Sequence, residues 1–210
     1  MAFGSGVLIS AISFELIDEA YHQSGVTATS LGFVSGIGLY TLGARALNRR
    51  GAMYRKRSGD RQKSSDASAM AIALGALLDG IPESIVIGLS LLSGKGVGLV
   101  TVFAVFISNV PEALSSSNGM KRAGRSRRYV FGLWGGIVLV SGIASFLGFS
   151  LFGKLDVMWV SALTALAGGG MLSMIVDTMI PEAYEEEGDW AGIITGAGFL
   201  ISFLASKLGS

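Results

Sequence analysis

Cysteine is absent from this 210-residue chain, and histidine occurs only once, at His22. The absence of cysteine excludes a disulfide framework and a thiolate metal site. Charged residues are also scarce, at 15% of the chain, whereas soluble globular proteins carry about a quarter. This scarcity excludes an ordinary soluble surface. The net charge of +1 says little about partners, because the few charges are clustered.

Half of the residues are hydrophobic, and they gather in stretches of the length that an α-helix needs, about 20 residues, to cross ~30 Å of hydrocarbon. Seven such stretches occur, at residues 2–21, 27–46, 68–92, 96–119, 129–152, 158–184 and 190–207. We therefore predict an all-α, polytopic protein of the inner (plasma) membrane with about seven transmembrane helices. No linker is long enough to suggest a second domain, so residues 1–210 are expected to form a single transmembrane domain in contact with the lipid bilayer.

Two basic segments set the expected orientation. Residues 47–67 and 121–128 are rich in lysine and arginine and are separated by two apolar stretches, so they fall on the same side of the membrane. The positive-inside rule places that side in the cytoplasm, which makes 47–67 a cytoplasmic basic loop. Basic residues beside membrane helices are expected in any case, so these runs do not indicate a nucleic-acid partner.

The first and sixth stretches resemble each other. Residues 1–25 align with residues 164–188 without gaps and share Ile-x-Glu-Ala-Tyr, followed four residues later by a glycine. An odd number of crossings separates the two stretches, so they must run in opposite directions. The segment DGIPESIVIG at 79–88 likewise resembles SNVPEALSSS at 108–117. Opposed repeats around a central helix pair recur in secondary transporters, and we predict that organisation here.

Proline is rarer than the charges, and each of the three prolines is followed by glutamate. Two of these pairs lie in the middle of the third and fourth stretches, where an ionised carboxylate costs at least ~2.5–3.5 kcal/mol. Residues four apart share a helix face, so the polar side chains of these two stretches converge if the helices face each other. The predicted cation site consists of Asp79, Glu83, Ser108, Asn109 and Glu112.

The prolines add backbone oxygens to this site. Pro82 and Pro111 each lack an N–H group, which leaves the carbonyls of Leu78 and Ile107 without their helical donors. Freed carbonyls in hydrocarbon need another partner, such as a water or a cation. The alternative is that the acids only hold helices together. Neither stretch contains a lysine or arginine to pair with them, and ionisable residues inside membranes are functional by default, so we favour the cation site.

At these residues the sequence resembles the ZIP (Zrt/Irt-like) family of divalent metal transporters, whose fourth and fifth helices carry His-Asn-x-Pro-Glu-Gly-type motifs. The counterparts here begin at Asp79 and Ser108. The resemblance implies two opposed three-helix repeats around a central pair, and transport of Zn²⁺, Fe²⁺, Mn²⁺ or similar ions into the cytoplasm as substrate, with no organic cofactor. The family has eight helices, so the family's first helix would lack a counterpart in these residues.

The departures from the family motif bear on the ion. The motif histidines are replaced by Asp79 and Ser108, Gly80 stands where the family has a ligating asparagine, and the fifth stretch has no carboxylate. A second metal site is therefore not expected. Imidazole suits zinc, copper, iron and nickel, whereas carboxylate and carbonyl oxygens suit magnesium, calcium and manganese. The all-oxygen ligand set thus shifts the expectation away from tight Zn²⁺ binding.

Three further acids are candidates for the ion pathway: Glu19, Asp177 and Glu182. Glu19 and Glu182 occupy matching repeat positions, and for them a pathway role and ordinary interfacial charge are equally plausible. His22 is expected on the surface. No nucleophile–base pair is visible, so an enzyme is not expected. Two rivals to metal transport stay open: a non-transporting membrane protein on the same fold, such as a metal sensor or structural partner, and a proton-coupled carrier of another cation. The oligomeric state is also open, with a homodimer as one option.

Overall fold

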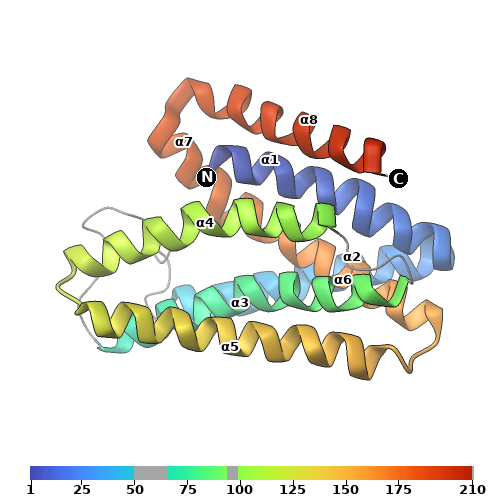
Figure 1. The fold of residues 1–210 in the computed structure, drawn as a ribbon, viewed down its shortest axis with the longest axis horizontal. Coiled ribbons are helices and arrows are strands. Elements are labelled where there is room, and N and C mark those ends of the chain that lie inside the picture. The colour runs from blue at the N-terminus through green and yellow to red at the C-terminus, as the bar shows by residue number, and fades with distance from the viewer. Residues whose placement is uncertain (50–65, 94–98, 210) are drawn as a thin grey trace.

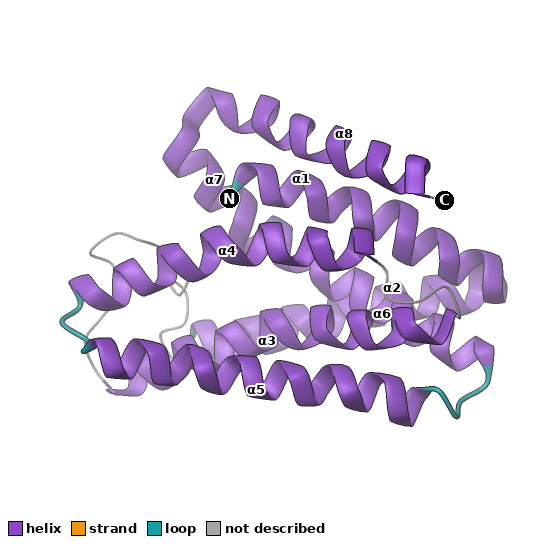
Figure 2. Ribbon diagram, viewed as in Figure 1, coloured by secondary structure: helices purple, strands orange, loops and turns teal. Residues whose placement is uncertain are grey.

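The computed structural model describes residues 1–49, 66–93 and 99–209, and this part of the chain is built from helices joined by short turns (Figure 2). In chain order the helices are α1 (Ala2–Ala11), the π-helical η1 (Ile12–Ile17), α2 (Asp18–Asn48), α3 (Asp66–Ser90), α4 (Leu99–Arg122), α5 (Arg127–Phe152), α6 (Val157–Met174), the π-helical η4 (Ile175–Met179), α7 (Ile180–Glu187) and α8 (Ala191–Gly209). Short 3₁₀ turns, η3 (Leu91–Ser93) and η5 (Gly188–Trp190), follow α3 and α7. The all-α prediction is confirmed for the described residues.

The number of membrane-length helices differs from the prediction. In the described part of the chain, three helices are long and apolar enough to cross a membrane, Ala2–Asn48, Arg127–Phe152 and Val157–Leu208, and not seven. The first and third are 47 and 52 residues long, about twice the length that spans ~30 Å. Each continues through a position where the sequence pattern separates two stretches. The helices α3 and α4 are not among the three, and they carry the acids and prolines of the predicted site.

Most of the predicted cytoplasmic loop at 47–67 lies outside the described residues. The other basic segment, 121–128, is described: it runs from the end of α4 at Arg122 through a turn into α5, which begins at Arg127. Ser126 caps this helix, because its side-chain oxygen accepts a hydrogen bond from the Tyr129 amide at 3.2 Å.

The helices α2 and α6 pack through glycine. A β-carbon placed on Gly32 or Gly36 of α2 would overlap the backbone carbonyls of Ala162 or Leu166 in α6. A β-carbon on Gly169 of α6 would likewise overlap the Phe33 carbonyl of α2. Small residues let helix backbones approach in this way inside membranes. Close helix packing through glycine therefore occurs at these three positions.

The helices α1 and α8 form a second close pair, and α5 lies along α3 (Figure 1). In the first of these pairs, a β-carbon on Gly6 of α1 would overlap the Thr195 carbonyl of α8, and one on Gly198 of α8 would overlap the Phe3 carbonyl of α1. Gly6 aligns with Gly169 in the sequence repeat. Gly6 packs α1 against α8, which comes after the repeat copy that contains Gly169. Gly169 packs α6 against α2, which comes after the repeat copy that contains Gly6.

Two irregular features also recur at aligned positions. Residues 12–17 form the π-helix η1, and the aligned residues 175–180 contain the π-helix η4. Eight residues beyond the end of the first lies Gly25, with φ 74°, and its aligned counterpart Gly188 has φ 56°. Positive φ suits glycine because it has no Cβ. Both glycines interrupt the long helices where the sequence pattern separates two spans, so the repeat extends from sequence to backbone conformation.

Candidate functional site

The helices α3 and α4 remain helical through their internal prolines. Pro82 lies inside α3 and Pro111 inside α4. Serine side chains bond to backbone carbonyls near both: the Ser84 hydroxyl donates to the Gly80 carbonyl at 2.7 Å, and the Ser108 hydroxyl donates to the Val105 carbonyl at 2.9 Å. Neither acceptor is a carbonyl that the prolines free, at Leu78 and Ile107, so these are local side-chain bonds within each helix.

Asp79 lies on the face of α3 that meets α2. Its side chain is 3% exposed, and its Oδ1 accepts a hydrogen bond of 2.7 Å from the hydroxyl of Tyr40. Tyr40 is equally buried, at 3% exposed. A buried carboxylate needs hydrogen bonds to offset its lost hydration, and the phenol supplies one from a neighbouring helix.

Glu83, one helical turn after Asp79, is held from another side. It is also 3% exposed, and its Oε2 accepts a hydrogen bond of 2.5 Å from the amide of Asn109 in α4. The same amide nitrogen donates to the Val105 carbonyl of its own helix at 2.8 Å. The two carboxylates of α3 therefore accept hydrogen bonds from neutral donors on two different helices, α2 and α4.

The structure brings only some of the predicted site residues together. Glu83 and Asn109 meet directly, and Asp79 lies one turn away on the same helix. Ser108 is buried, but its hydroxyl donates to its own helix, and its backbone lies close to Gly4 of α1. Glu112 belongs to α4, and its side chain lies outside the described residues.

The described side chains include no group of three or more histidine, cysteine, aspartate or glutamate residues that could hold a metal ion. What they do offer is a pair of buried carboxylates with an amide and a phenol beside them. The carboxylates are oxygen ligands, and the phenol and the amide donate hydrogen bonds to them. Oxygen ligands suit hard divalent cations.

The three candidate pathway acids lie in different environments. Glu19 and Asp177 are exposed, and Glu19 accepts a hydrogen bond of 2.9 Å from Gln23. Glu182 is buried, at 3% exposed. The aligned pair Glu19 and Glu182 is therefore not equivalent in burial. His22 is on the surface as expected, with its Nε2 3.5 Å from Asp18.

Tyr40 is the site residue that the sequence did not reveal. It lies on α2 in a buried stripe with four-residue spacing, together with Gly32, Gly36 and Ala44. A buried tyrosine usually finds a partner for its hydroxyl. A single tyrosine in an apolar stretch of small residues was therefore a usable signal, although it does not say which helix holds the partner.

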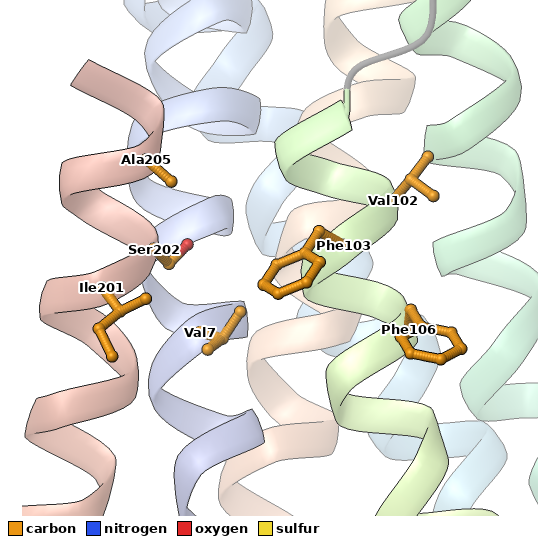
Figure 3. A pocket seen from close by; sticks show the side chains of 7 residues that line it. All are labelled: Val7, Val102, Phe103, Phe106, Ile201, Ser202 and Ala205. Atoms are coloured by element: carbon orange, nitrogen blue, oxygen red, sulfur yellow. The ribbon is translucent and has the colours of Figure 1, made fainter. Parts of the chain in front are cut away.

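A separate apolar pocket of about 490 Å³ lies between α4 and α8, over α1 (Figure 3). Phe103 of α4 points across it toward Val7 of α1 and Ile201 of α8. Ser202 also lines it and is buried, and its hydroxyl has no hydrogen-bond partner among the described residues. None of the predicted site residues lines this pocket, so it is distinct from the carboxylate pair.

Comparison with known proteins leaves the assignment to these features alone. No family model matches the chain, and no curated protein and no solved structure matches it.

Proposed function

We propose that this protein carries a divalent cation across the inner membrane toward the cytoplasm, in the manner of the ZIP-type transporters that its sequence resembles. The observation that carries the proposal is the buried pair Asp79 and Glu83, one turn apart on a helix with an internal proline. Two buried carboxylates concentrate negative charge where charge is expensive. A passing divalent cation is the natural counter-charge for such a pair.

The ligand chemistry points to the class of ion. Asp79 and Glu83 supply carboxylate oxygens, and Asn109, whose amide nitrogen donates to Glu83, carries a further oxygen donor. The sequence adds Glu112 and the carbonyls near the prolines. Oxygen donors suit manganese and magnesium better than they suit zinc, so Mn²⁺ is the first ion to test. A site of moderate affinity also suits a carrier, which must release its substrate.

The transport step in this proposal is an exchange of access around the carboxylate pair. Opposed repeats provide such exchange in secondary transporters, because one repeat moves against the other around a fixed site. Three features support opposed repeats here: the aligned π-helices, the aligned positive-φ glycines Gly25 and Gly188, and the aligned close approaches at Gly6 and Gly169. Separate spans on either side of each positive-φ glycine, together with α3, α4 and α5, would make the seven crossings that the sequence indicates.

The direct test is uptake into vesicles. The purified protein is reconstituted, and uptake of Mn²⁺, Zn²⁺, Fe²⁺ and Co²⁺ is measured for the wild type and for Glu83→Ala and Glu112→Ala. Glu186→Gln, an exposed acid in α7, is the matched control. We expect saturable uptake that the control retains and that each of the two site variants lowers by tenfold or more. Absence of flux for every ion would refute transport, and flux that survives both site variants would refute the site.

One observation favours a second candidate, a non-transporting protein in which the acids form a structural network. Tyr40 and Asn109 already donate to the two carboxylates and link α3 to α2 and α4. Under this candidate the acids matter for stability and not for metal. Equilibrium binding of Mn²⁺ to the purified protein separates the two, because a purely structural network predicts no binding that depends on Glu83.

A further inference from the structure

The hydrogen bond between Tyr40 and Asp79 reaches the proposed site from a helix that the sequence motif does not include. The phenol oxygen lies 2.7 Å from Oδ1 of Asp79, and both side chains are 3% exposed. This is the short distance typical of a hydroxyl bonded to a carboxylate. The bond therefore fixes one oxygen of the carboxylate in a place that water does not reach.

The packing of α2 explains why the phenol arrives there. Gly32 and Gly36 hold α2 so close to α6 that a β-carbon at either would overlap the α6 backbone. Tyr40 follows one turn later on the same buried stripe, with its Cβ near Gly170. Gly43, nearly one turn further, lies against the Leu78 side chain of α3. The glycine stripe thus sets the distance over which the tyrosine ring reaches α3.

We propose that Tyr40 is a positioning residue for the cation site, acting through Asp79. By holding Oδ1, the phenol orients the whole carboxylate. The position of Oδ2 is therefore set before the ion binds. Ligating carboxylates are commonly held in this way by outer hydrogen bonds, and loss of such a partner costs about 10–100-fold in metal affinity. A phenol is a neutral donor, so it orients the carboxylate without supplying a competing positive charge. This inference rests on the proposed function.

The test compares Tyr40→Phe with the wild type in Mn²⁺ binding to the purified protein and in uptake by vesicles. Tyr129→Phe is the matched control, because it removes a phenol hydroxyl from α5, far from Asp79 in the chain and facing Arg125. We expect Tyr40→Phe to raise the dissociation constant for Mn²⁺ and the half-saturating concentration for uptake by about 10–100-fold. The maximal uptake rate should stay within about twofold, since the ligands themselves are intact.

A merely structural role for Tyr40 predicts a different pattern. It would lower the melting temperature and the maximal rate together and leave the dissociation constant of the folded fraction unchanged, and that result would overturn the inference. Tighter Mn²⁺ binding by Tyr40→Phe would also overturn it, because the phenol would then be competing with the ion.

A double-mutant cycle localises the effect. If Tyr40 acts through Asp79, the change in Mn²⁺ affinity caused by Tyr40→Phe should disappear in the Asp79→Ala background, which removes the acceptor of the Tyr40 hydroxyl. An undiminished effect there would place the action of Tyr40 elsewhere and refute the assignment. Failure of the proposed function is distinguishable from all of these results, because the wild type itself would then show no Mn²⁺ binding that depends on Glu83.

Discussion

Replacing Gly36 with alanine should loosen the contact between α2 and α6, on which the position of Tyr40 depends. A β-carbon at Gly36 would overlap the carbonyl oxygen of Leu166 and would lie 3.0 Å from the backbone nitrogen of Gly170. Backbone atoms cannot rotate away as a flexible side chain can, so the two helices must separate. Overpacking of this kind costs about 1–3 kcal/mol.

Gly38 provides an internal control on the same helix. It is exposed, and a β-carbon there would meet no atom within 4 Å. Alanine is favoured over glycine inside a helix by roughly 0.5–1 kcal/mol, and this gain is common to both substitutions. The difference between Gly36→Ala and Gly38→Ala therefore isolates the packing cost, which we expect to be about 1–3 kcal/mol.

The assay is thermal unfolding of the two variants in the same detergent and in the absence of metal. A difference of 1 kcal/mol moves the melting temperature of a chain of this size by about 2–4 °C. Gly36→Ala should therefore melt at roughly 2–12 °C below Gly38→Ala. Gly36→Ala should also weaken Mn²⁺ binding, because a shift of α2 against α6 disturbs the hydrogen bond from Tyr40 to Asp79. Equal melting temperatures for the two variants would refute the close approach of α2 and α6.

Three further outcomes follow from the geometry. Glu182→Ala should lower the free energy of unfolding by about 1–3 kcal/mol, because it removes a buried polar group from its partners. Glu19→Ala, at an exposed position, should change the free energy of unfolding by less than ~0.5 kcal/mol. Thermal unfolding of both variants checks this difference. Gly188→Ala should cost about 1–3 kcal/mol because φ is 56° there, and a melting temperature equal to that of the wild type would contradict the assigned backbone. Asn109→Asp should replace the donor to Glu83 with a second carboxylate, so the melting temperature should fall without metal and rise more steeply than that of the wild type when Mn²⁺ is added.

The sequence predicted where the candidate acids Asp79 and Glu83 lie better than it predicted their contacts. The motif and the i, i+4 spacing placed Asp79 and Glu83 on one helix face, and the structure confirms that both are buried there. The contact between Glu83 and Asn109 follows from two motif-bearing helices that meet. Tyr40 was not predicted, because a hydrogen bond between residues 39 apart in the chain depends on how far the α2 backbone approaches α6 and α3.

The repeat was visible in the sequence as shared residues, but its physical content was not. A glycine at both aligned positions, Gly25 and Gly188, does not by itself predict that both have positive φ. The residue types at 12–17 likewise do not predict a π-helix. Matching residues also do not guarantee matching environments. Glu19 and Glu182 align, yet one is exposed and the other buried, because burial depends on which helices pack on each copy.

The span count illustrates a limit of hydropathy. A sequence window responds to polar residues such as those that flank Gly25, and it divides a helix there whether or not the helical hydrogen bonds stop. The chain is helical on both sides of Gly25, and only that residue lies outside the helical region of φ and ψ. A bend at one residue and a loop of several residues look alike to a window of about 20 residues.

The donors to the carboxylate pair sharpen the choice between transport and a structural network. Tyr40 and Asn109 are neutral, so they stabilise Asp79 and Glu83 without cancelling their charge. A network that only joins helices needs the hydrogen bonds and not the charge, and glutamine in place of Glu83 could still accept a hydrogen bond from Asn109. Under transport, Glu83→Gln should keep or raise the melting temperature without metal, because burying an amide costs less than burying a charge, and it should abolish the melting-temperature increase that Mn²⁺ gives the wild type. A wild type whose melting temperature does not respond to Mn²⁺, alongside a Glu83→Gln variant that melts at the wild-type temperature, would favour the structural network.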